Sequence, residues 1–272
     1  MISSISTPFK LSTFSSAMLT TKAKKPALFL FPHQDDEFAV FSLLEQNVRN
    51  GIRNICVYLT DGGGNSASPI ARDAESQSVL AKLGIAKEDI IIFGGAERVP
   101  DGKLVDAMDR TFSELVDRFG PADIGTVYAP AWEGGHPDHD AATLIASAFA
   151  KQFPDVDVWQ FPLYNSYRVG IVPFRVFNPI PGNGDIVRVP FSGSAIGRYL
   201  GYCLAYRTQR KTFAALLPFV ALSFMLDRSQ MLQSLNHDRL SSKPHDGDML
   251  YERRRWLTWE QFKARAASFV SR

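Results

Sequence analysis

The chain has few cysteines. Only Cys56 and Cys203 occur among its 272 residues, in the apolar stretches NICVYLT and GYCLAY and without CxxC spacing. Two such thiols cannot form the disulfide framework that is typical of small secreted domains. We therefore expect two buried, reduced cysteines and a cytoplasmic protein.

The chain also lacks an excess of charge of one sign. Its 30 lysines and arginines are offset by 28 acids, which gives a formal net charge of +2. Such a balance creates no whole-chain field that would favour nucleic acid, and we expect no nucleic-acid partner. The densest basic run, ERRRW at residues 252–256, is predicted to be the solvated face of a C-terminal helix.

Long hydrophobic runs are missing as well. The run FAALLPFVALSFML at residues 213–226 is fourteen residues long and is interrupted by Pro218. It is too short to cross a bilayer as a helix, so we interpret it as buried core and expect no stable membrane insertion. A segment that touches a membrane is the alternative.

The first 25 residues contain no acid and no continuous apolar core of the kind found in secretory signals. We expect a flexible arm here, although an organelle transit peptide shares this composition. The remainder, residues 26–272, is predicted to be a single domain, because no linker rich enough to separate two domains is present. Its core would span residues 27–161, and residues 162–272 would form a C-terminal elaboration.

From residue 27 onward, apolar runs of strand length alternate with segments of helical period. This alternation is typical of βαβ units and predicts an α/β fold, a Rossmann-like parallel sheet flanked by helices, with further strands and helices after residue 162. The predicted strands are 27–31, 54–59, 89–93, 125–129, 156–161, 169–177 and 186–189, and the predicted helices are 37–50, 70–83, 104–119, 138–152, 195–210 and 212–226.

Two clusters of histidine and carboxylate follow the first and fourth predicted strands. They read FPHQDDEF at residues 31–38 and HPDHD at residues 136–140. In such folds, ligands bind beyond the carboxyl ends of the strands where the winding direction reverses, so the two clusters should face one another. Imidazole and carboxylate together suit zinc or another divalent transition metal. The alternative is that these acids only stabilise helix N-termini.

The spacing of His33 and Asp36 allows both side chains to reach one ion from a turn that enters a helix. Asp35 then points elsewhere and could face a water molecule on the metal. A carboxylate in that position is suited to act as a general base.

Taken together, PHQDDE after the first strand and HPDHDAA after the fourth resemble the PIG-L/LmbE family of zinc-dependent de-N-acetylases. The resemblance covers residues 27–152. A third matching element is TDGG at residues 60–63 with RDAE at 72–75, and a weaker fourth is PDGKL at 100–104.

The resemblance implies a role for each residue of the two main motifs. His33, Asp36 and His139 would bind the zinc ion. Asp35 would be the general base, and His136 would stabilise the oxyanion or protonate the departing amine.

Three further roles follow from the resemblance. Asp138 would orient His136 through a carboxylate–imidazole hydrogen bond. Arg72 and Asp101 would contact the substrate. For Arg72, the alternative is a surface ion pair with Glu75, one helical turn away.

Two features depart from the family pattern. Gln34 stands where proline is more usual, which should leave the ligand geometry intact. Gly134 and Gly135 stand where some members carry larger residues, so contacts with the substrate and with the transition state could differ.

The resemblance implies a hydrolase that removes an N-acyl group, most often acetyl, from a small-molecule or glycoconjugate substrate containing an amino sugar. The alternatives are a zinc amidase acting on a substrate that is not a sugar, and a non-catalytic sugar-binding module on the same fold. The sequence leaves the identity of the substrate and the oligomeric state open.

Overall fold

The computed structural model describes residues 12–13, 25–63, 68–93, 97–120 and 123–271. Of the expected N-terminal arm, only β1 (Ser12–Thr13) and Lys25 fall within these ranges, and β1 pairs with a strand of the central sheet. The rest of that arm lies outside the described residues. The division into an arm and one domain therefore stays a prediction.

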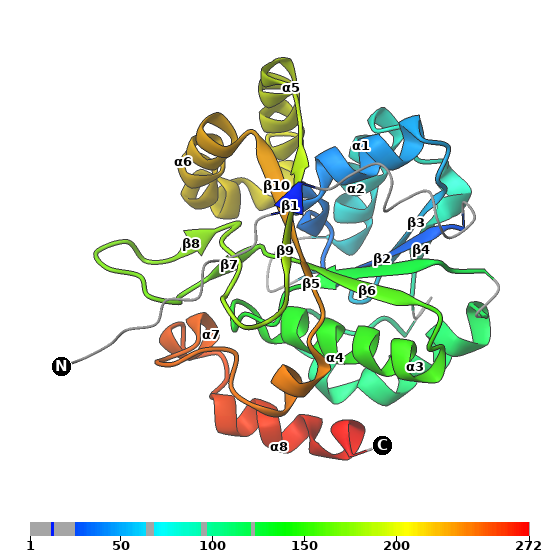
Figure 1. Ribbon diagram of the computed structural model, residues 1–272, viewed down its shortest axis with the longest axis vertical. Helices are drawn as coiled ribbons and strands as arrows, with labels where there is room; N and C mark the ends of the chain where they lie inside the picture. The colour runs from blue at the N-terminus through cyan, green and yellow to red at the C-terminus, as the bar shows by residue number, and fades with distance from the viewer. Residues whose placement is uncertain (1–11, 14–24, 64–67, 94–96, 121–122, 272) are drawn as a thin grey trace.

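One large sheet organises the described part of the chain (Figure 1). Its strand order is β1-β9-β10-β6-β5-β2-β3-β4. The five strands from β4 to β6 are parallel to one another, which confirms the predicted α/β fold with a parallel core. These strands are β2 (Ala27–Phe31), β3 (Asn54–Tyr58), β4 (Ile90–Ile92), β5 (Thr126–Pro130) and β6 (Asp157–Phe161).

Helices cover both faces of this sheet (Figure 1). Alternate side chains of β2 serve the two layers, because successive residues of a strand point to opposite faces. Phe29 and Phe31 belong to one buried cluster, whereas Leu28 and Leu30 belong to the other. The first cluster packs under α1 (Phe41–Arg49), α2 (Pro69–Lys82), α5 (Gly193–Cys203) and α6 (Arg210–Asp227), and the second under α3 (Met108–Arg118), α4 (Pro137–Gln152) and α8 (Trp259–Val270).

Short elements complete the chain. Two of them shape the region beyond the strand ends: η2 (Asp36–Ala39) leads into α1, and η4 (Leu104–Asp106) leads into α3. The remaining short elements are η3 (Lys87–Asp89), η5 (Arg207–Gln209), η6 (His237–Ser241), α7 (Leu250–Arg253) and the antiparallel pair β7 (Tyr164–Asn165) and β8 (Arg175–Val176).

The C-terminal elaboration joins the same sheet. Strand β10 (Ser229–Ser234) runs antiparallel to both β6 and β9 (Ile186–Pro190) and lies between them. The strand predicted at 169–177 is largely wrong, since only β8 forms there. Most of this segment is a loop that pairs with no strand of the described chain. Ile171 in this loop is fully exposed, and Arg168 at its start has a positive φ of 47°, which extended strands do not adopt.

The apolar segment at residues 213–226 is only half buried. Its inner face is core, as predicted, with Phe213, Leu216, Val220 and Phe224 buried at helical spacing. Leu222, Met225 and Leu226 are more than half exposed on the outer face, so the interpretation as buried core is wrong for that face. Among the described residues, no helix is long and apolar enough to cross a membrane.

Candidate metal centre

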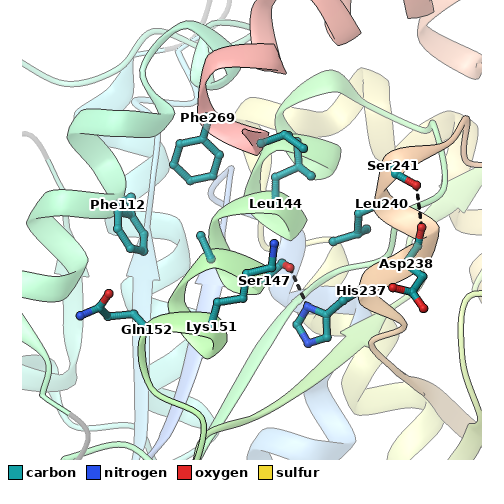
Figure 2. Close-up of a pocket in the computed structure, with 12 residues that line it drawn as sticks. Phe112, Leu144, Ser147, Lys151, Gln152, His237, Asp238, Leu240, Ser241 and Phe269 are labelled. Carbon is teal, nitrogen blue, oxygen red and sulfur yellow. Dashed lines mark hydrogen bonds between the residues drawn. The ribbon is translucent and has the colours of Figure 1, made fainter. Parts of the chain in front are cut away.

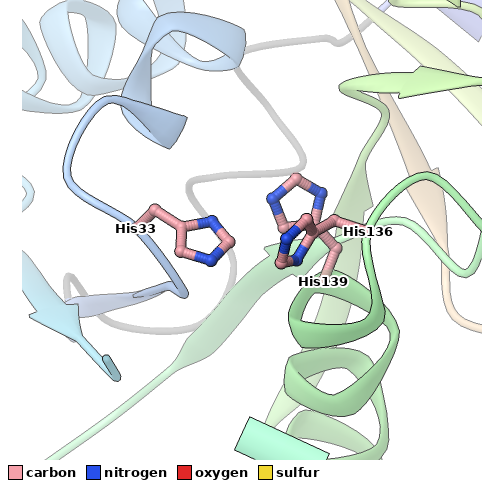
Figure 3. Close-up of side chains that lie close together, drawn as sticks. All are labelled: His33, His136 and His139. Carbon is pink, nitrogen blue, oxygen red and sulfur yellow. The ribbon is translucent and has the colours of Figure 1, made fainter. Parts of the chain in front are cut away.

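The loops that follow β2 and β5 meet at the carboxyl edge of the sheet. These strands are neighbours in the strand order, and the winding direction reverses between them. Three buried imidazole rings converge there (Figure 3): the ring centroids of His33 and His136 are 4.6 Å apart, and that of His139 lies 5.3 Å from each. The structure thus brings together the two histidine clusters that lie over a hundred residues apart in the sequence.

Two sets of potential ligand atoms converge tightly enough to share one ion. His33, His136 and His139 form one set, and His33, Asp101, His136 and Asp138 form the other, with the atoms of each set within 4.8 Å of one another. Within the described residues, Asp36 belongs to neither set. The structure therefore adds His136, Asp101 and Asp138 to the donors that a metal could use.

Asp36 links two of the histidines through its separate oxygens. Its Oδ1 lies 3.1 Å from His139 Nε2, and its Oδ2 accepts from the His33 amide at 2.8 Å and lies 3.4 Å from His33 Nδ1. Burial opposes ionisation of this carboxyl, but the charges of His139 and His33 lower its pKa well below the ordinary range. Asp36 is therefore held as a carboxylate between two imidazoles.

The donor chemistry fits a divalent transition metal. Imidazole nitrogens and carboxylate oxygens, all nearly excluded from water, are the ligands that a borderline cation prefers. His139 Nδ1 is buried without a hydrogen-bond partner among the described groups. Burial lowers the pKa of His33, but the carboxylates of Asp101 and Asp36 raise it well above its ordinary value. Without a metal, protonated His33 would balance the negative charge of these carboxylates. A bound cation could balance it instead.

Asp138 contacts a different histidine from the one expected. Its carboxylate accepts from the amides of Gly102 and Leu104 at 2.6 and 2.9 Å, and its Oδ2 lies 3.1 Å from His33 Nε2. Towards His136 it presents its backbone amide, which donates to Nδ1 at 3.2 Å. The expected carboxylate–imidazole contact is thus made with His33, because the loop at 102–104 turns the carboxylate away from His136.

Asp101 lies within reach of the metal centre. Its Oδ1 is 3.1 Å from His33 Nε2 and 3.7 Å from His136 Nε2. Partial burial raises the pKa of this carboxyl, but the charge of His33 and its hydrogen bond lower it well below the usual value. The residue was expected to contact the substrate, and its position makes it a candidate metal donor as well.

Asp35 is held beside the metal centre in a conformation that few residues adopt. Its φ of 127° and ψ of −19° lie outside the common regions, and such backbone strain tends to occur at functional sites. Its amide donates to Oε2 of the buried Glu37 at 3.0 Å, and Glu37 Oε1 accepts from the Tyr206 hydroxyl at 2.8 Å. Glu37 and Tyr206 therefore fix the main chain on which Asp35 is carried.

The Asp35 carboxylate pairs with Arg72, whose Nη2 lies 3.0 Å from Oδ1. Burial raises the pKa of Asp35 to about 8, and the charge of Arg72 opposes that shift. Arg72 is buried and donates further to the carbonyls of Gly62 and Gln34. The alternative ion pair with Glu75 is wrong, because Glu75 accepts from Thr208 instead.

The metal centre opens into a small cavity of about 190 Å³. Its wall includes Tyr164, Phe213, Arg254 and Trp256, in addition to the histidines and carboxylates. The Trp256 side chain is half exposed, and its ring lies 5.1 Å from that of His136, between centroids. The Arg254 guanidinium lies 5.0 Å from the centre of the Trp256 ring.

Arg254 and Trp256 were not among the residues predicted for the site. The run 252–256 was interpreted as a solvated helix face, but α7 ends at Arg253 and Arg255 adopts a positive φ of 58°. The turn brings Arg254 and Trp256 to the cavity. One feature of the sequence indicates this role: Trp256 is an aromatic residue at the end of a basic run, and a solvated helix face does not require a tryptophan.

A larger cavity of about 570 Å³ lies elsewhere, among α3, α4, α8 and η6 (Figure 2). Ser147 Oγ and His237 Nδ1 are 2.7 Å apart at its wall, while Phe112, Leu240 and Phe269 make much of the lining apolar. Burial and the charge of Lys151 lower the pKa of His237. Clustered carboxylates with strongly shifted pKa values mark the smaller cavity instead as the candidate catalytic site.

The structure explains why glycine occupies positions 134 and 135. A Cβ atom on Gly135 would lie 2.1 Å from the Tyr164 carbonyl oxygen, and one on Gly134, whose φ is 67°, would lie 2.1 Å from Met249 Sδ. A larger residue at 135 would therefore displace the Tyr164 main chain, and one at 134 would have to adopt a strained φ and displace the Met249 side chain. Both glycines allow the segments that carry Tyr164 and Trp256 to close over the centre.

The segment that carries the metal centre is similar in sequence to a known family. Residues 28–150 match the model of the PIG-L family, which is described as GlcNAc-PI de-N-acetylase. The resemblance to the PIG-L family is confirmed over this segment. The PIG-L segment contains every site residue predicted from the sequence and ends within α4. No curated protein sequence matches the chain.

Solved structures share the fold. A teicoplanin-pathway deacetylase in a "deacetylase-bog complex" superposes with a TM-score of 0.59 at 15% identity, covering 78% of this chain and 98% of that one. The "zinc inhibited form of teicoplanin deacetylase Orf2" gives 0.53 at 14% identity, covering 78% and 98%. N,N'-diacetylchitobiose deacetylase from Pyrococcus horikoshii gives 0.53 at 16% identity, covering 83% and 93%. These likenesses extend the shared fold beyond the PIG-L segment into the C-terminal elaboration.

Proposed function

We propose that the protein is a metal-dependent N-deacetylase that removes an acyl group, acetyl in the first instance, from an amino-sugar substrate. The observation that supports this most directly is the convergence of three buried imidazoles with Asp36, Asp101 and Asp138 beside the Asp35–Arg72 pair. The description of the PIG-L family and the names of the deacetylases that share the fold point to the same reaction. The metal is zinc or another divalent transition metal.

The residues that would hold the metal are His33, Asp36 and His139, with Asp101, Asp138 and His136 close enough to contribute. Polarisation of the amide carbonyl and activation of water are the chemistry that a bound divalent cation would supply. The remaining steps fall to side chains around the cavity.

Asp35 would take the proton from the attacking water. Its carboxylate lies at the cavity and is held by the Arg72 guanidinium at 3.0 Å. Burial raises the pKa of Asp35 to about 8, close to neutral pH, which suits a group that must both accept and release a proton during the reaction. Arg72 would thus position the base and limit that rise.

His136 would stabilise the oxyanion. Its Nδ1 accepts from the Asp138 amide, so the proton of the neutral ring is on Nε2, which faces Asp101 and the cavity. Burial, together with the charge of His33, lowers the pKa of His136 to about 3. A neutral ring that donates from Nε2 would bind the developing oxygen charge, and the proton taken by Asp35 could then pass to the departing amine.

The alternatives predict different behaviour. A zinc amidase for a substrate without a sugar would hydrolyse simple N-acetyl amines as fast as N-acetylglucosamine conjugates. A non-catalytic sugar-binding module would bind such conjugates without releasing acetate, and the strained, buried base beside the metal site would then have no use.

Metal removal gives the direct test. We expect the purified protein to release acetate from at least one conjugate in a panel of N-acetylglucosamine derivatives, to lose this activity with a chelator, and to regain it when a divalent metal is restored. Zinc should be titrated rather than added in excess, because one deacetylase that shares the fold is described as inhibited by zinc. Acetate release that persists in the metal-free protein, shown by elemental analysis, would contradict the proposal.

Trp256 offers a test of the sugar. An exposed aromatic ring at the mouth of the cavity, flanked by Arg254, is suited to stack on the apolar face of a sugar ring. We expect Trp256→Ala to raise KM by roughly 5–20-fold with a small change in kcat, since a stacking contact of about 1–2 kcal/mol is lost before the chemical step. Trp256→Phe should recover most of the affinity. A fall in kcat alone would assign the ring to another role.

A further inference from the structure

The outer face of α6 carries an apolar stripe that nothing in the described chain covers. Its most exposed large side chains are Leu222 at 51%, Met225 at 55% and Leu226 at 74%. Ala214, Ala215 and Pro218 extend the stripe towards the start of the helix and are also exposed. Their spacing of three and four residues places them on one side of the helix, opposite the buried Phe213, Leu216, Val220 and Phe224.

Basic residues stand at both ends of this stripe. Arg210 and Lys211 begin the helix and Arg228 follows its last residue, and all three are exposed. Between residues 204 and 228 the sequence has four basic residues and one acidic residue, a net charge of +3, although the whole chain carries only +2. The acid, Asp227, lies 3.7 Å from Arg188 and is partly offset.

A second exposed apolar group lies next to α6. The loop between β7 and β8 presents Ile171, which is fully exposed, and Val172. The same loop ends at Phe174, whose ring lies 5.1 Å from that of Phe219 in α6. Figure 1 shows this loop and α6 projecting on one side of the molecule, away from α8.

We propose that this outer face of α6, with the neighbouring loop, docks on the surface of an anionic lipid bilayer. An apolar stripe with lysine and arginine at its borders is the pattern of a helix that lies in the plane of a membrane interface. The apolar side chains enter the boundary between headgroups and acyl chains, and the cations contact lipid phosphates. The segment is too short and too amphipathic to span the bilayer, and no other helix in the described ranges is long and apolar enough to do so.

The charges favour a lipid surface over a second copy of the chain. If two copies packed α6 against α6 in antiparallel fashion, Arg210 and Lys211 of one would face Arg228 of the other. In a parallel arrangement, each of these cations would face the same residue of the other copy. Either arrangement places these cations opposite one another at both ends of the contact, where the one acid, Asp227, is already shared with Arg188, whereas an anionic bilayer neutralises them.

The docked orientation has a consequence for the cavity. Thr212, Phe213 and Leu216 of α6 line the cavity next to the metal centre on their inner side. One helix would therefore contact lipid with its outer face and border the cavity with its inner face. The mouth of the cavity would then open close to the level of the lipid headgroups.

Vesicle flotation tests the proposal without any substrate, so its outcome is independent of whether the deacetylase activity is found. We expect the full chain to bind vesicles of phosphatidylcholine mixed with phosphatidylglycerol, to bind pure phosphatidylcholine more weakly, and to be released by salt. The triple variant Leu222→Gln, Met225→Gln, Leu226→Gln should lose more than about tenfold in binding. The double variant Arg210→Gln, Lys211→Gln should lose roughly fivefold per removed charge.

Ile70→Gln is the matched control, because Ile70 is 80% exposed on α2 and lies outside the stripe. It should bind vesicles like the wild type. All variants change exposed side chains, and their unfolding temperatures should match that of the wild type. Unchanged binding by the triple variant, or no binding by the wild type, would overturn the proposal. If the triple variant instead dissolves a dimer seen by sedimentation, a second copy occupies this face and the lipid proposal is wrong.

Discussion

Asp35→Asn is expected to lower kcat by about 10²–10⁴-fold while the protein keeps its full metal content. Asparagine preserves the size of the side chain and tolerates a positive φ better than most residues, so the strained main chain should survive the change. What disappears is the ability to accept a proton from water. Steady-state kinetics and elemental analysis on the same preparation measure both quantities.

The Asp89–Arg53 pair provides a matched control for this prediction. Asp89 is also a buried carboxylate bound to an arginine, with Oδ1 2.6 Å from Arg53 Nη2, but it belongs to η3 and is not part of the cavity lining. Asp89→Asn should weaken folding without changing kcat. A comparable loss of kcat in both variants would mean that Asp35 acts through stability. Loss of metal in Asp35→Asn alone would make Asp35 a ligand and not the base.

The sequence was sufficient to predict the parallel core of the fold. Strand β2 is a continuous apolar run, β3 and β5 are apolar after a first polar residue, and each strand is followed by a loop that contains glycine, proline or acids. Because both faces of these strands are buried, the hydrophobic signal is strong and local. The positions of the two histidine clusters follow from the same reasoning, since topology alone places the ends of β2 and β5 side by side.

Strand β10 could not be found in this way. Its sequence SQMLQS contains two apolar residues, yet Gln230 and Gln233 are buried. Gln230 donates to the Phe38 carbonyl at 2.7 Å and accepts from Ser42, and Gln233 donates to the carbonyls of Ile180 and Gly184. The side-chain NH2 groups of both glutamines donate to carbonyls far away in the sequence, so a largely polar segment with only a weak hydrophobic signal forms a strand inside the sheet.

Individual contacts within the site were the hardest to predict. The direction of the Asp138 carboxylate depends on two amides at residues 102 and 104, and the approach of Trp256 depends on a turn at Arg255. Both contacts are set by loops that close over the centre from other parts of the chain. Residue types and spacing identify which side chains carry the chemistry, but these loops decide which pairs of them touch.

His139→Ala is expected to abolish both metal binding and activity. His139 is fully buried in the first turn of α4 and contacts Asp36, so water cannot readily replace its nitrogen. Metal affinity should fall by more than the roughly 10–100-fold that loss of an outer hydrogen-bond partner costs. His237→Ala, which removes an imidazole beside Ser147 in the larger cavity, is the control and should retain both metal and activity.

The same measurement on His136→Ala tests the ligand set implied by the resemblance, which lacks His136, against the sets that the geometry brings together, which contain it. If His33, Asp36 and His139 hold the metal, His136→Ala keeps the metal and loses turnover, because only the oxyanion donor is gone. If the metal instead binds the set that contains His33, Asp101, His136 and Asp138, His136→Ala loses the metal while His139→Ala retains much of it. Unfolding of each variant in the metal-free form should be compared with that of the metal-free wild type, since a cavity left by a buried ring can itself destabilise α4. Metal retained in full by a folded His139→Ala protein would remove this residue from the ligands.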